Sequence, residues 1–499
     1  MDNLYNFLNN ETNRKLKFIE ILHRQDEWVT LSVITKVLDC SDKVLRNDIK
    51  QINLDFAPFM IISSPKGVVL EYPPTINIEF IYSEILKNSI EYQIIENVFF
   101  KPKISITELS EIIYSSEIGI RRKIKELSSK TEQSGFRIEI TGGQCNIVGE
   151  EVQIRNFLSH YFFEKMYYDE APFDSTEYQV VGTLIDYVEK GTYGNYGMDI
   201  RREVINYLLI SLRRVSAGSF LLTEKRKSKV HRSISFKEII ANTFFQREFF
   251  HVFKMKLNQS LLEELTCVFV TYEFSLPKRG LKFNEDIFFP TIKTNIGEQI
   301  IRMSKDLEIP IYNIDGILNR VFVDLAIYVG PLFVLHDRNK LFVSRLERSY
   351  PNFIQHLKQV IASFSKKHDI EFEESLLNQI IFSIMVEWHG ILTYLENYRA
   401  KVKIALLVDS SPSHANYLAE LIEHQVGGKL NVTHVFNQKT KKQQQEIANC
   451  QLLITTISEY DVHGVLSICI DCNPSLNDLK EIQSLVETIS QEEFNNRLN

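Results

Sequence analysis

The sequence predicts a mainly α-helical, multidomain protein whose last part is a small α/β domain. Three observations carry this prediction. A helix–helix–hairpin pattern occurs twice near the N-terminus, a nearly continuous helical pattern runs from about Val152 to Asn397, and strand and helix patterns alternate after Lys401. With 499 residues, the chain is long enough for several domains of roughly 100–150 residues each.

The first of the two patterns has the element order of a winged helix-turn-helix. A first helix is expected over Asn13–Trp28, and a short second helix over Ser32–Leu38, capped by its first residue. Ser41 is expected to cap a third helix over Asp42–Leu54. In "MIISSPKGVVLEY", Met60–Tyr72, two apolar runs flank Ser-Pro-Lys-Gly, which is a hairpin signal.

The same order of elements recurs 75 residues further along the chain. Apolar positions, helix caps, an arginine and the turn glycine all recur in register. The aligned pairs are Ser32 with Thr107, Ile34 with Leu109, Val37 with Ile112, Leu38 with Ile113, Ser41 with Ser116, Leu45 with Ile120, Arg46 with Arg121, Ile49 with Ile124, and Gly67 with Gly142. The second hairpin is expected over Phe136–Glu150. Two unrelated helical hairpins would match the apolar positions alone, so the sequence predicts tandem winged helix-turn-helix domains.

Each third helix combines an apolar face with a polar, cationic face that suits the major groove of DNA. Arginine pairs bidentately with guanine, asparagine pairs with adenine, and lysine more often neutralises phosphate. The predicted DNA-contacting residues are Lys43, Arg46, Asn47 and Lys50, Lys66 at the first hairpin tip, and Arg121, Arg122, Lys123 and Lys125. The segment "GIRRKIKEL" makes the second helix the more basic one. The alternative is a solvated basic face, but its repetition in a winged frame favours double-stranded DNA as the partner.

Break patterns divide the remainder of the chain. "SLPKRG", Ser275–Gly280, lies near the middle of the long helical region and predicts two all-α bundles. After Lys401, strand-like runs such as "KVKIALLVD" alternate with helices, which predicts a parallel sheet. The predicted domains are residues 1–74 and 75–165 for the winged repeats, 166–284 and 285–398 for the bundles, and 399–499 for the α/β domain.

Other classes of protein fit the sequence less well. The net charge of −7 is mild, six scattered cysteines favour a reducing cytosol, and no run approaches 18 apolar residues. We therefore expect a cytoplasmic protein without a membrane span. The chain has no Walker loop, no dinucleotide-binding glycine motif and no HExxH, so neither an enzyme nor a cofactor is expected. Cys469-x-x-Cys472 lacks a second pair of ligands, so buried cysteines at a strand end are favoured over zinc or a redox pair.

The order of winged repeats, two bundles and an α/β domain resembles the Mga/AtxA-like virulence regulators of Gram-positive bacteria. The resemblance rests on the domain order, on the segments Leu31–Asn53 and Ile106–Lys130, and on the C-terminal pattern. It implies that the bundles are phosphotransferase-system regulatory domains (PRDs) and that the last domain is similar to a sugar-transporter EIIB component. It also implies a DNA-binding transcriptional regulator, usually an activator, that self-associates as a dimer. In relatives, the phosphocarrier of the sugar phosphotransferase system acts on bundle histidines.

The sequence departs from that family's phosphorylation pattern. The phospho-acceptor histidine positions fall on Tyr207 and Tyr328, and the other usual positions on Thr271 and Val386. A tyrosine phenol is a poor nucleophile near pH 7, so phosphate transfer is not expected there. His336 or His389 would be the remaining acceptors. In the EIIB-like loop the cysteine position holds Val408 or Asp409, which argues against phosphoryl transfer.

Two functions of other classes compete with the transcription factor. The first is an RNA-binding antiterminator, which shares the regulatory bundles but carries a small β-rich RNA domain in place of two helix-rich repeats. The second is a phosphotransferase component, against which the missing loop cysteine argues. Apolar stripes on the helix Ala415–Gln425 and on the last helix are compatible with either a core or a dimer interface.

Overall fold

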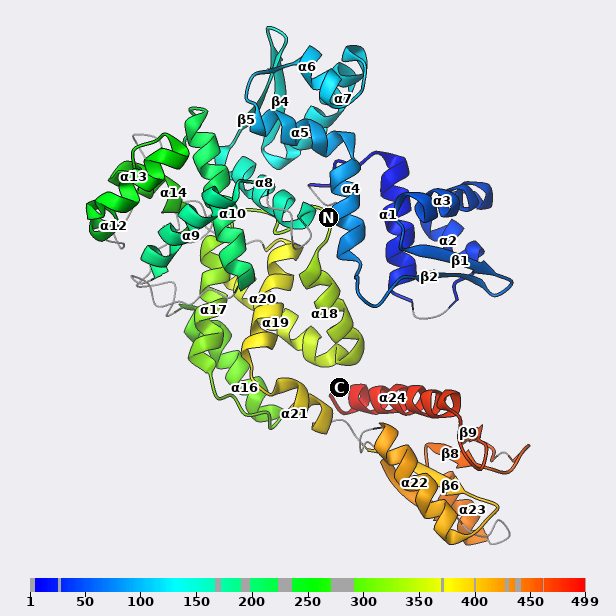
Figure 1. The fold of residues 1–499 in the computed structure, drawn as a ribbon. Coiled ribbons are helices and arrows are strands. Elements are labelled where there is room, and N and C mark those ends of the chain that lie inside the picture. The colour runs from blue at the N-terminus through cyan, green and yellow to red at the C-terminus, as the bar shows by residue number, and fades with distance from the viewer. Residues whose placement is uncertain are drawn as a thin grey trace. The chain divides into compact units, whose positions relative to one another are not determined.

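The computed structural model describes residues 5–25, 28–166, 172–189, 198–222, 236–270, 291–368, 372–398, 401–426, 430–435, 441–460 and 462–498 (Figure 1). They belong to two compact units. One unit contains Met1–Phe283 with Val323–Arg338 and Asp369–Leu376, and the other contains Asn284–Phe322, Asn339–His368 and Leu377–Asn499. The described part is mainly helical with a small parallel α/β region near the C-terminus, as the sequence predicts.

The first winged repeat of the first unit contains three helices and a hairpin, as predicted. They are α1 (Asn10–His23), α2 (Leu31–Leu38), α3 (Asp42–Asp55), β1 (Met60–Ser64) and β2 (Gly67–Glu71). Two expectations are corrected. Helix α1 begins earlier than expected because Asn9 caps it, and it ends earlier as well, at His23. Thr30 rather than Ser32 occupies the N-cap position of α2.

The second repeat uses the same elements and adds one strand. They are α5 (Ile90–Phe100), β3 (Ile104–Ser105), α6 (Ile106–Ile112), α7 (Glu117–Thr131), the short η1 (Glu132–Ser134), β4 (Phe136–Thr141) and β5 (Gln144–Gly149). The strands form an antiparallel sheet in the order β3-β5-β4. Ser105 caps α6 through its hydroxyl, so the Thr107 that aligns with Ser32 is not a cap either.

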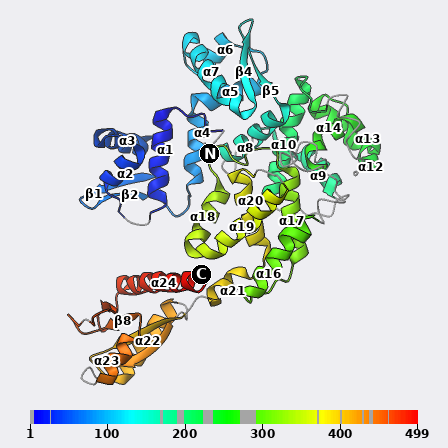
Figure 2. The same cartoon turned by 180° about the vertical axis from the view of Figure 1, so that it is seen from behind.

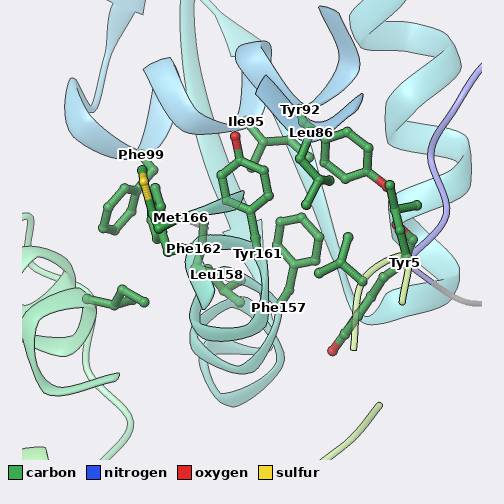
Figure 3. Packing of buried hydrophobic residues seen from close by; sticks show 14 of the residues in the cluster. Tyr5, Leu86, Tyr92, Ile95, Phe99, Phe157, Leu158, Tyr161, Phe162 and Met166 are labelled. Atoms are coloured by element: carbon green, nitrogen blue, oxygen red, sulfur yellow. The ribbon is translucent and has the colours of Figure 1, made fainter. Parts of the chain in front are cut away.

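Two further helices join the repeats and carry their common core. Helix α4 (Glu79–Asn88) follows the first repeat and packs on α8 (Glu151–Lys165), which follows the second (Figure 1, and from behind in Figure 2). Aromatic rings of α5 and α8 stack beneath the second repeat, with Tyr92 and Tyr161 nearly parallel at 5.7 Å (Figure 3). The Tyr92 hydroxyl donates to the carbonyl of Tyr5 at 2.7 Å, so the N-terminal segment closes over this core.

The first unit continues with the helices of the first predicted bundle. They are α9 (Ser175–Glu189), α10 (Met198–Ser216), α12 (Lys237–Ala241), α13 (Thr243–Phe253) and α14 (Gln259–Val270). Arg155 of α8 is fully buried and bridges Glu151 at 2.9 Å and Glu264 of α14 at 2.8 Å. A buried charge is tolerated only when it is paired, so this triad fixes α8 against the bundle.

The remaining elements are those of the predicted second bundle and of the α/β region. The bundle contains η4 (Lys293–Gly297), α16 (Glu298–Asp306), α17 (Ile314–Ile327), α18 (Arg338–Ser349), α19 (Pro351–Lys367), α20 (Glu374–Glu387) and α21 (Ile391–Tyr398). The parallel sheet has the order β7-β6-β8-β9, with β6 (Val402–Leu407), β7 (Leu430–Val435), β8 (Leu452–Thr455) and β9 (Leu466–Cys469). Its helices are α22 (Pro412–Val426), α23 (Lys441–Ala448) and α24 (Leu476–Leu498).

The packing of the α/β region shows what the apolar stripes of its helices do. Ala415, Leu418 and Ile422 of α22 are buried in one cluster with the strands, and Ile482 and Val486 of α24 join it. At these residues the apolar stripes are therefore part of the core of the α/β region. Large apolar side chains that stay exposed in this region are Tyr417, Leu466 and Leu476.

Candidate nucleic-acid interface

Helix α3 is set up as the recognition helix of the first repeat. The turn before it reverses at Asp39, whose φ of 47° is left-handed, and Ser41 Oγ accepts from Val44 N at 3.4 Å to begin the helix. Leu45 and Ile52 are fully buried, so they fix which face of α3 points inward. The opposite face is therefore open to solvent.

Four predicted residues lie on that open face at helical spacing. Lys43, Arg46, Asn47 and Lys50 are all exposed, and their spacing of i, i+3, i+4 and i+7 places them in one stripe. We call these four residues the first stripe. Arg46 Nε is 2.7 Å from Asp42 Oδ2, but both side chains are more than half exposed. A pair this exposed is weak, so Arg46 is available to another anion.

A buried ion pair holds α3 at a fixed angle to α1. Arg14 donates from Nε and from one terminal nitrogen to the two oxygens of Asp48, at 2.7 and 3.0 Å, and Asp48 is only 1% exposed. Hydrogen bonding to this carboxylate raises the pKa of Arg14. The hairpin is fixed to the same helix, because the Asn53 side chain donates to the Ile61 carbonyl and accepts from the Ile61 amide.

Helix α7 presents the equivalent face in the second repeat. Ser116 Oγ accepts from Gly119 N at 3.1 Å, and Ile120, Ile124 and Leu127 are buried against the hairpin core. Ser128 Oγ then donates to the Ile138 carbonyl at 2.8 Å, which fixes the hairpin to α7. Residues 118, 121, 122 and 125 form the exposed stripe, in the same register as the first.

We call Ile118, Arg121, Arg122 and Lys125 the second stripe. Arg121, Arg122 and Lys125 are exposed as predicted, and the nearest carboxylate oxygen to Arg122, on Glu126, is 3.8 Å away. With Lys43, Arg46 and Lys50 in the first stripe, each recognition helix presents three cations. The second helix contains more cations in its sequence, as expected, but its exposed stripe has the same number of cations as the first stripe.

The prediction that Lys123 belongs to this exposed face is wrong. Its Nζ is 2.8 Å from Glu91 Oε1 of α5, and its side chain is only 25% exposed. Lys123 aligns with Asp48 of the first repeat, which is likewise paired with the first helix of its own repeat. The two repeats thus use the same position for an ion pair of opposite polarity.

The hairpin tips differ between the repeats. Lys66 is exposed at the first tip, as predicted, and is followed by Gly67 with a φ of 133°. A Cβ on Gly67 would lie 2.3 Å from the Val29 carbonyl oxygen, because Val29 pairs with Val68 beside the hairpin. The second tip is Gly142–Gly143, both with positive φ and no side chain of either charge.

Sequence reasoning passed over two exposed apolar residues of the second repeat. Ile118 occupies the stripe position that Lys43 occupies in the first repeat, and Tyr114 occupies the left-handed turn position of Asp39. Alignment of the two repeats would have identified both residues, because they align with polar residues of the first repeat and neither core needs an apolar side chain at these positions.

The tyrosines at the predicted phospho-acceptor positions are buried. Tyr207 lies in α10, and burial raises its pKa well above the ordinary value. Burial also raises the pKa of Tyr328, whose hydroxyl donates to Glu373 at 2.8 Å and lies 2.9 Å from Ser375 Oγ. Val386 is exposed, and Thr271 lies outside the described residues.

The two remaining histidine candidates have different surroundings. His336 is buried against the ring of Tyr82 at 4.3 Å, and burial lowers its pKa to about 3, with a smaller contribution from Arg338. Its backbone amide and those of Val334 and Leu335 donate to the Glu164 carboxylate of α8. His389 is exposed in the turn that follows α20.

In the α/β region, the loop after β6 contains the hydroxyls of Ser410 and Ser411 and no thiol. Asp409 exchanges hydrogen bonds with Thr456, its amide donating at 3.1 Å and its carboxylate accepting at 2.8 Å. Cys469 and Cys472 are exposed free cysteines rather than the buried ones expected. Within the described residues, no group of three or more histidine, cysteine or carboxylate side chains is placed to hold a metal. No described helix is long and apolar enough to cross a membrane.

Comparison with known proteins matches two family profiles to the two repeats. The M protein trans-acting positive regulator (MGA) HTH domain matches residues 11–67, and the Mga helix-turn-helix domain matches residues 74–162. The chain is 22% identical to a "putative trans-acting regulator" of Streptococcus pneumoniae over 84% of this chain and 85% of that one. It is 22% identical to the "capsule synthesis positive regulator AcpB" of Bacillus anthracis, over 94% and 97%, and 24% identical to the "anthrax toxin expression trans-acting positive regulator" of Bacillus anthracis, over 36% and 37%.

Proposed function

Because family models of Mga helix-turn-helix domains match both winged repeats, we propose that the chain is an Mga/AtxA-like regulator that activates transcription from duplex DNA bound by both repeats at once. Helices α3 and α7 enter successive stretches of the major groove, and Lys66 reaches the backbone beside the first of them. The observation that carries this proposal is the repeated stripe. Residues 43, 46, 47 and 50 and residues 118, 121, 122 and 125 occupy the same exposed positions on two helices of the same frame.

The charge of the stripes determines how this grip depends on salt. Three cations on each recognition helix, together with Lys66, contact phosphates or guanines. Each phosphate that is neutralised lowers the slope of log affinity against log salt by about 0.9. Both repeats contribute, so removal of one set of cations leaves a shallower slope and a weaker complex rather than no complex.

The test is a mobility shift with the full chain at low salt, comparing duplex DNA with hairpin RNA. Retention of duplex DNA that is weakened by Arg121→Ala with Arg122→Ala and abolished by the further change Arg46→Ala supports the proposal. Lys293→Ala is the matched control, since this exposed lysine of the second unit pairs with Asp315 and should leave the shift unchanged. Absence of any duplex shift would refute it, and preferential retention of the hairpin would favour the antiterminator alternative.

For the regulatory part, we propose two PRD-like bundles and an EIIB-like domain that no longer carry phosphate at the positions of Tyr207, Tyr328 and Asp409. Burial raises the pKa of both tyrosine hydroxyls, so they are poor nucleophiles near pH 7, and the loop that contains Asp409 lacks the thiol that accepts phosphate in a working EIIB component. Incubation with the phosphocarrier protein and labelled phosphoenolpyruvate should leave these sites unlabelled. Label on a tyrosine or in the loop would support a phosphotransferase component, whereas label on His389 alone would identify the exposed histidine as the phosphocarrier's target.

We also propose that the chain works in the cytoplasm as a homodimer. The stripes of α22 and α24 are occupied by the core of the α/β region, so the dimer contact falls on its exposed residues, Tyr417 and Leu476 among them. Light scattering of the full chain should give twice the monomer mass, and Tyr417→Glu should reduce it. A monomeric mass at micromolar concentration would contradict the proposal.

A further inference from the structure

We propose that Ile118 and Tyr114 form an apolar surface that recognises thymine by contacting its C5 methyl group in the major groove. This inference rests on the proposed binding of duplex DNA and adds which base the second repeat selects. In this division of roles, the first repeat grips the DNA with charge and the second also discriminates its sequence.

The two side chains are exposed to a degree that the fold does not require. Tyr114 is 96% exposed and Ile118 is 83% exposed, the two highest values for large hydrophobic side chains in the described parts of the chain. Ile118 lies on α7 opposite to the buried Ile120 and Ile124, so it contributes nothing to the core of the repeat. Tyr114 lies in the turn that precedes the helix.

The position of Ile118 places it at the DNA-facing end of the stripe. It precedes Arg121 and Arg122 by three and four residues, so its side chain neighbours theirs on the same face of α7. The N-terminal residues of a recognition helix are those that reach base edges. Arginines one turn further along supply the contacts to phosphate or guanine that bring this end of the helix into the groove.

Comparison with the first repeat shows that the apolar character is specific to the second. The equivalent positions hold Asp39 and Lys43, both polar. The turn residue has a φ of 47° in the first repeat and 54° in the second, a conformation that suits aspartate or asparagine and disfavours a bulky side chain. A tyrosine is therefore unfavourable at this backbone conformation. Because its ring is exposed, neither the turn nor the core of the repeat explains why a tyrosine is present.

The chemistry of the ligand follows from the groove. The thymine methyl is the one apolar group that the base edges of the major groove present, and apolar side chains read it by contact. The carboxylate next to Ile118 is turned away from this face, because Glu117 Oε1 accepts from Thr107 Oγ1 at 2.6 Å and is thereby held toward α6. Cations beyond Ile118 favour a polyanion over a protein partner for this surface.

The test uses the full chain and a random pool of duplex DNA, from which the bound fraction is selected and sequenced. A selected duplex is then remade with deoxyuridine for thymidine, which removes only the methyl groups. Wild-type affinity should fall about fourfold for each contacted methyl, the factor that corresponds to one methyl-sized apolar group. Ile118→Lys combined with Tyr114→Asp, which restores both residue types of the first repeat, should bind both duplexes equally, and Ile118→Ala alone should show a smaller difference between them.

A matched control is Phe244→Ala, which removes another exposed apolar side chain, on α13 rather than on a recognition helix, and should leave the discrimination unchanged. The inference is overturned if wild type binds the two duplexes equally, or if Ile118→Ala keeps the full difference. It is also overturned if Ile118→Ala lowers transcription without changing either affinity, which would indicate a protein partner. Failure to retain any duplex would instead refute the proposed function itself.

Discussion

Replacement of Lys123 by methionine separates two roles that this side chain could have, a structural one and a DNA contact. Lys123 Nζ lies 2.8 Å from Glu91 Oε1, and the Glu91 side chain is only 8% exposed. Removing one partner of a buried ion pair costs about 3–5 kcal/mol. Because a quarter of the lysine is exposed and Glu91 keeps a 2.8 Å hydrogen bond from Ser89 Oγ, we expect a smaller loss, about 2 kcal/mol.

Hydrogen exchange of the full chain is the suitable assay, since a multidomain protein has no single unfolding free energy. A loss of about 2 kcal/mol in local stability makes the amides of α7 exchange about 30-fold faster. Lys125→Met is the matched control. Its side chain is exposed in the second stripe, so we expect unchanged exchange and weaker duplex binding.

The pH dependence of the same variant gives a second readout. Burial raises the pKa of Glu91, but hydrogen bonds from Lys123, the backbone and Ser89 outweigh it and hold the pKa below 4.5. In wild type this contribution to stability is present above pH 4.5 and is lost as the pH falls through the lowered pKa. In Lys123→Met the pKa of Glu91 should rise, so the excess exchange at pH 7 should shrink on acidification. Unchanged exchange combined with weakened DNA binding would refute the structural role and restore Lys123 to the DNA-contacting face.

Three other outcomes are expected. Gly67→Ala should destabilise the first hairpin by more than about 1 kcal/mol, because Gly67 has a positive φ and the new Cβ would lie 2.3 Å from Val29 O. Hydrogen exchange of the β1 and β2 amides would measure the loss, and an unchanged exchange rate would contradict the prediction. Glu164→Ala should expose residues 334–336 to protease, because three backbone amides lose their acceptor, whereas Glu164→Gln should be milder; equal resistance of both variants to wild type would refute the role. His336 should stay neutral from pH 5 to 8, because burial lowers its pKa to about 3. The folded protein should lose stability as the pH falls below about 6.5, since the unfolded chain then binds a proton that the folded His336 does not. An imidazole NMR titration centred near pH 6.5 would disprove this prediction.

The sequence was informative where a local signal alone determines the outcome. The hairpin at Ser64–Gly67, the cap at Ser41 and the four strands of the parallel sheet were all predicted, because turn glycines, hydroxyl caps and apolar runs act over a few residues. The register of 75 residues identified both recognition helices for the same reason. The caps of α2 and α6 were each placed two residues late, because a second hydroxyl residue, Ser32 or Thr107, follows the true cap, Thr30 or Ser105.

Side-chain partners between distant segments were beyond prediction from one sequence. In the sequence, Lys123 is one of four cations in "GIRRKIKEL", and only the packing of α5 against α7 shows that Glu91 lies beside it. Helix α4 was not anticipated, because its role is to pack on α8, which follows it by more than 60 residues. The buried surroundings of Tyr207 and Tyr328 also depend on tertiary contacts that the sequence does not reveal.

The opposite polarity of the two ion pairs has a consequence for how a duplicated sequence folds correctly. In the first repeat the first helix supplies the arginine and α3 the aspartate, whereas in the second α5 supplies the glutamate and α7 the lysine. If α1 docked on α7, Arg14 would face Lys123, and if α5 docked on α3, Glu91 would face Asp48. Each exchange would bury two like charges, so mispairing between the repeats, or between two copies of the chain, is disfavoured at the place where their apolar patterns are most alike.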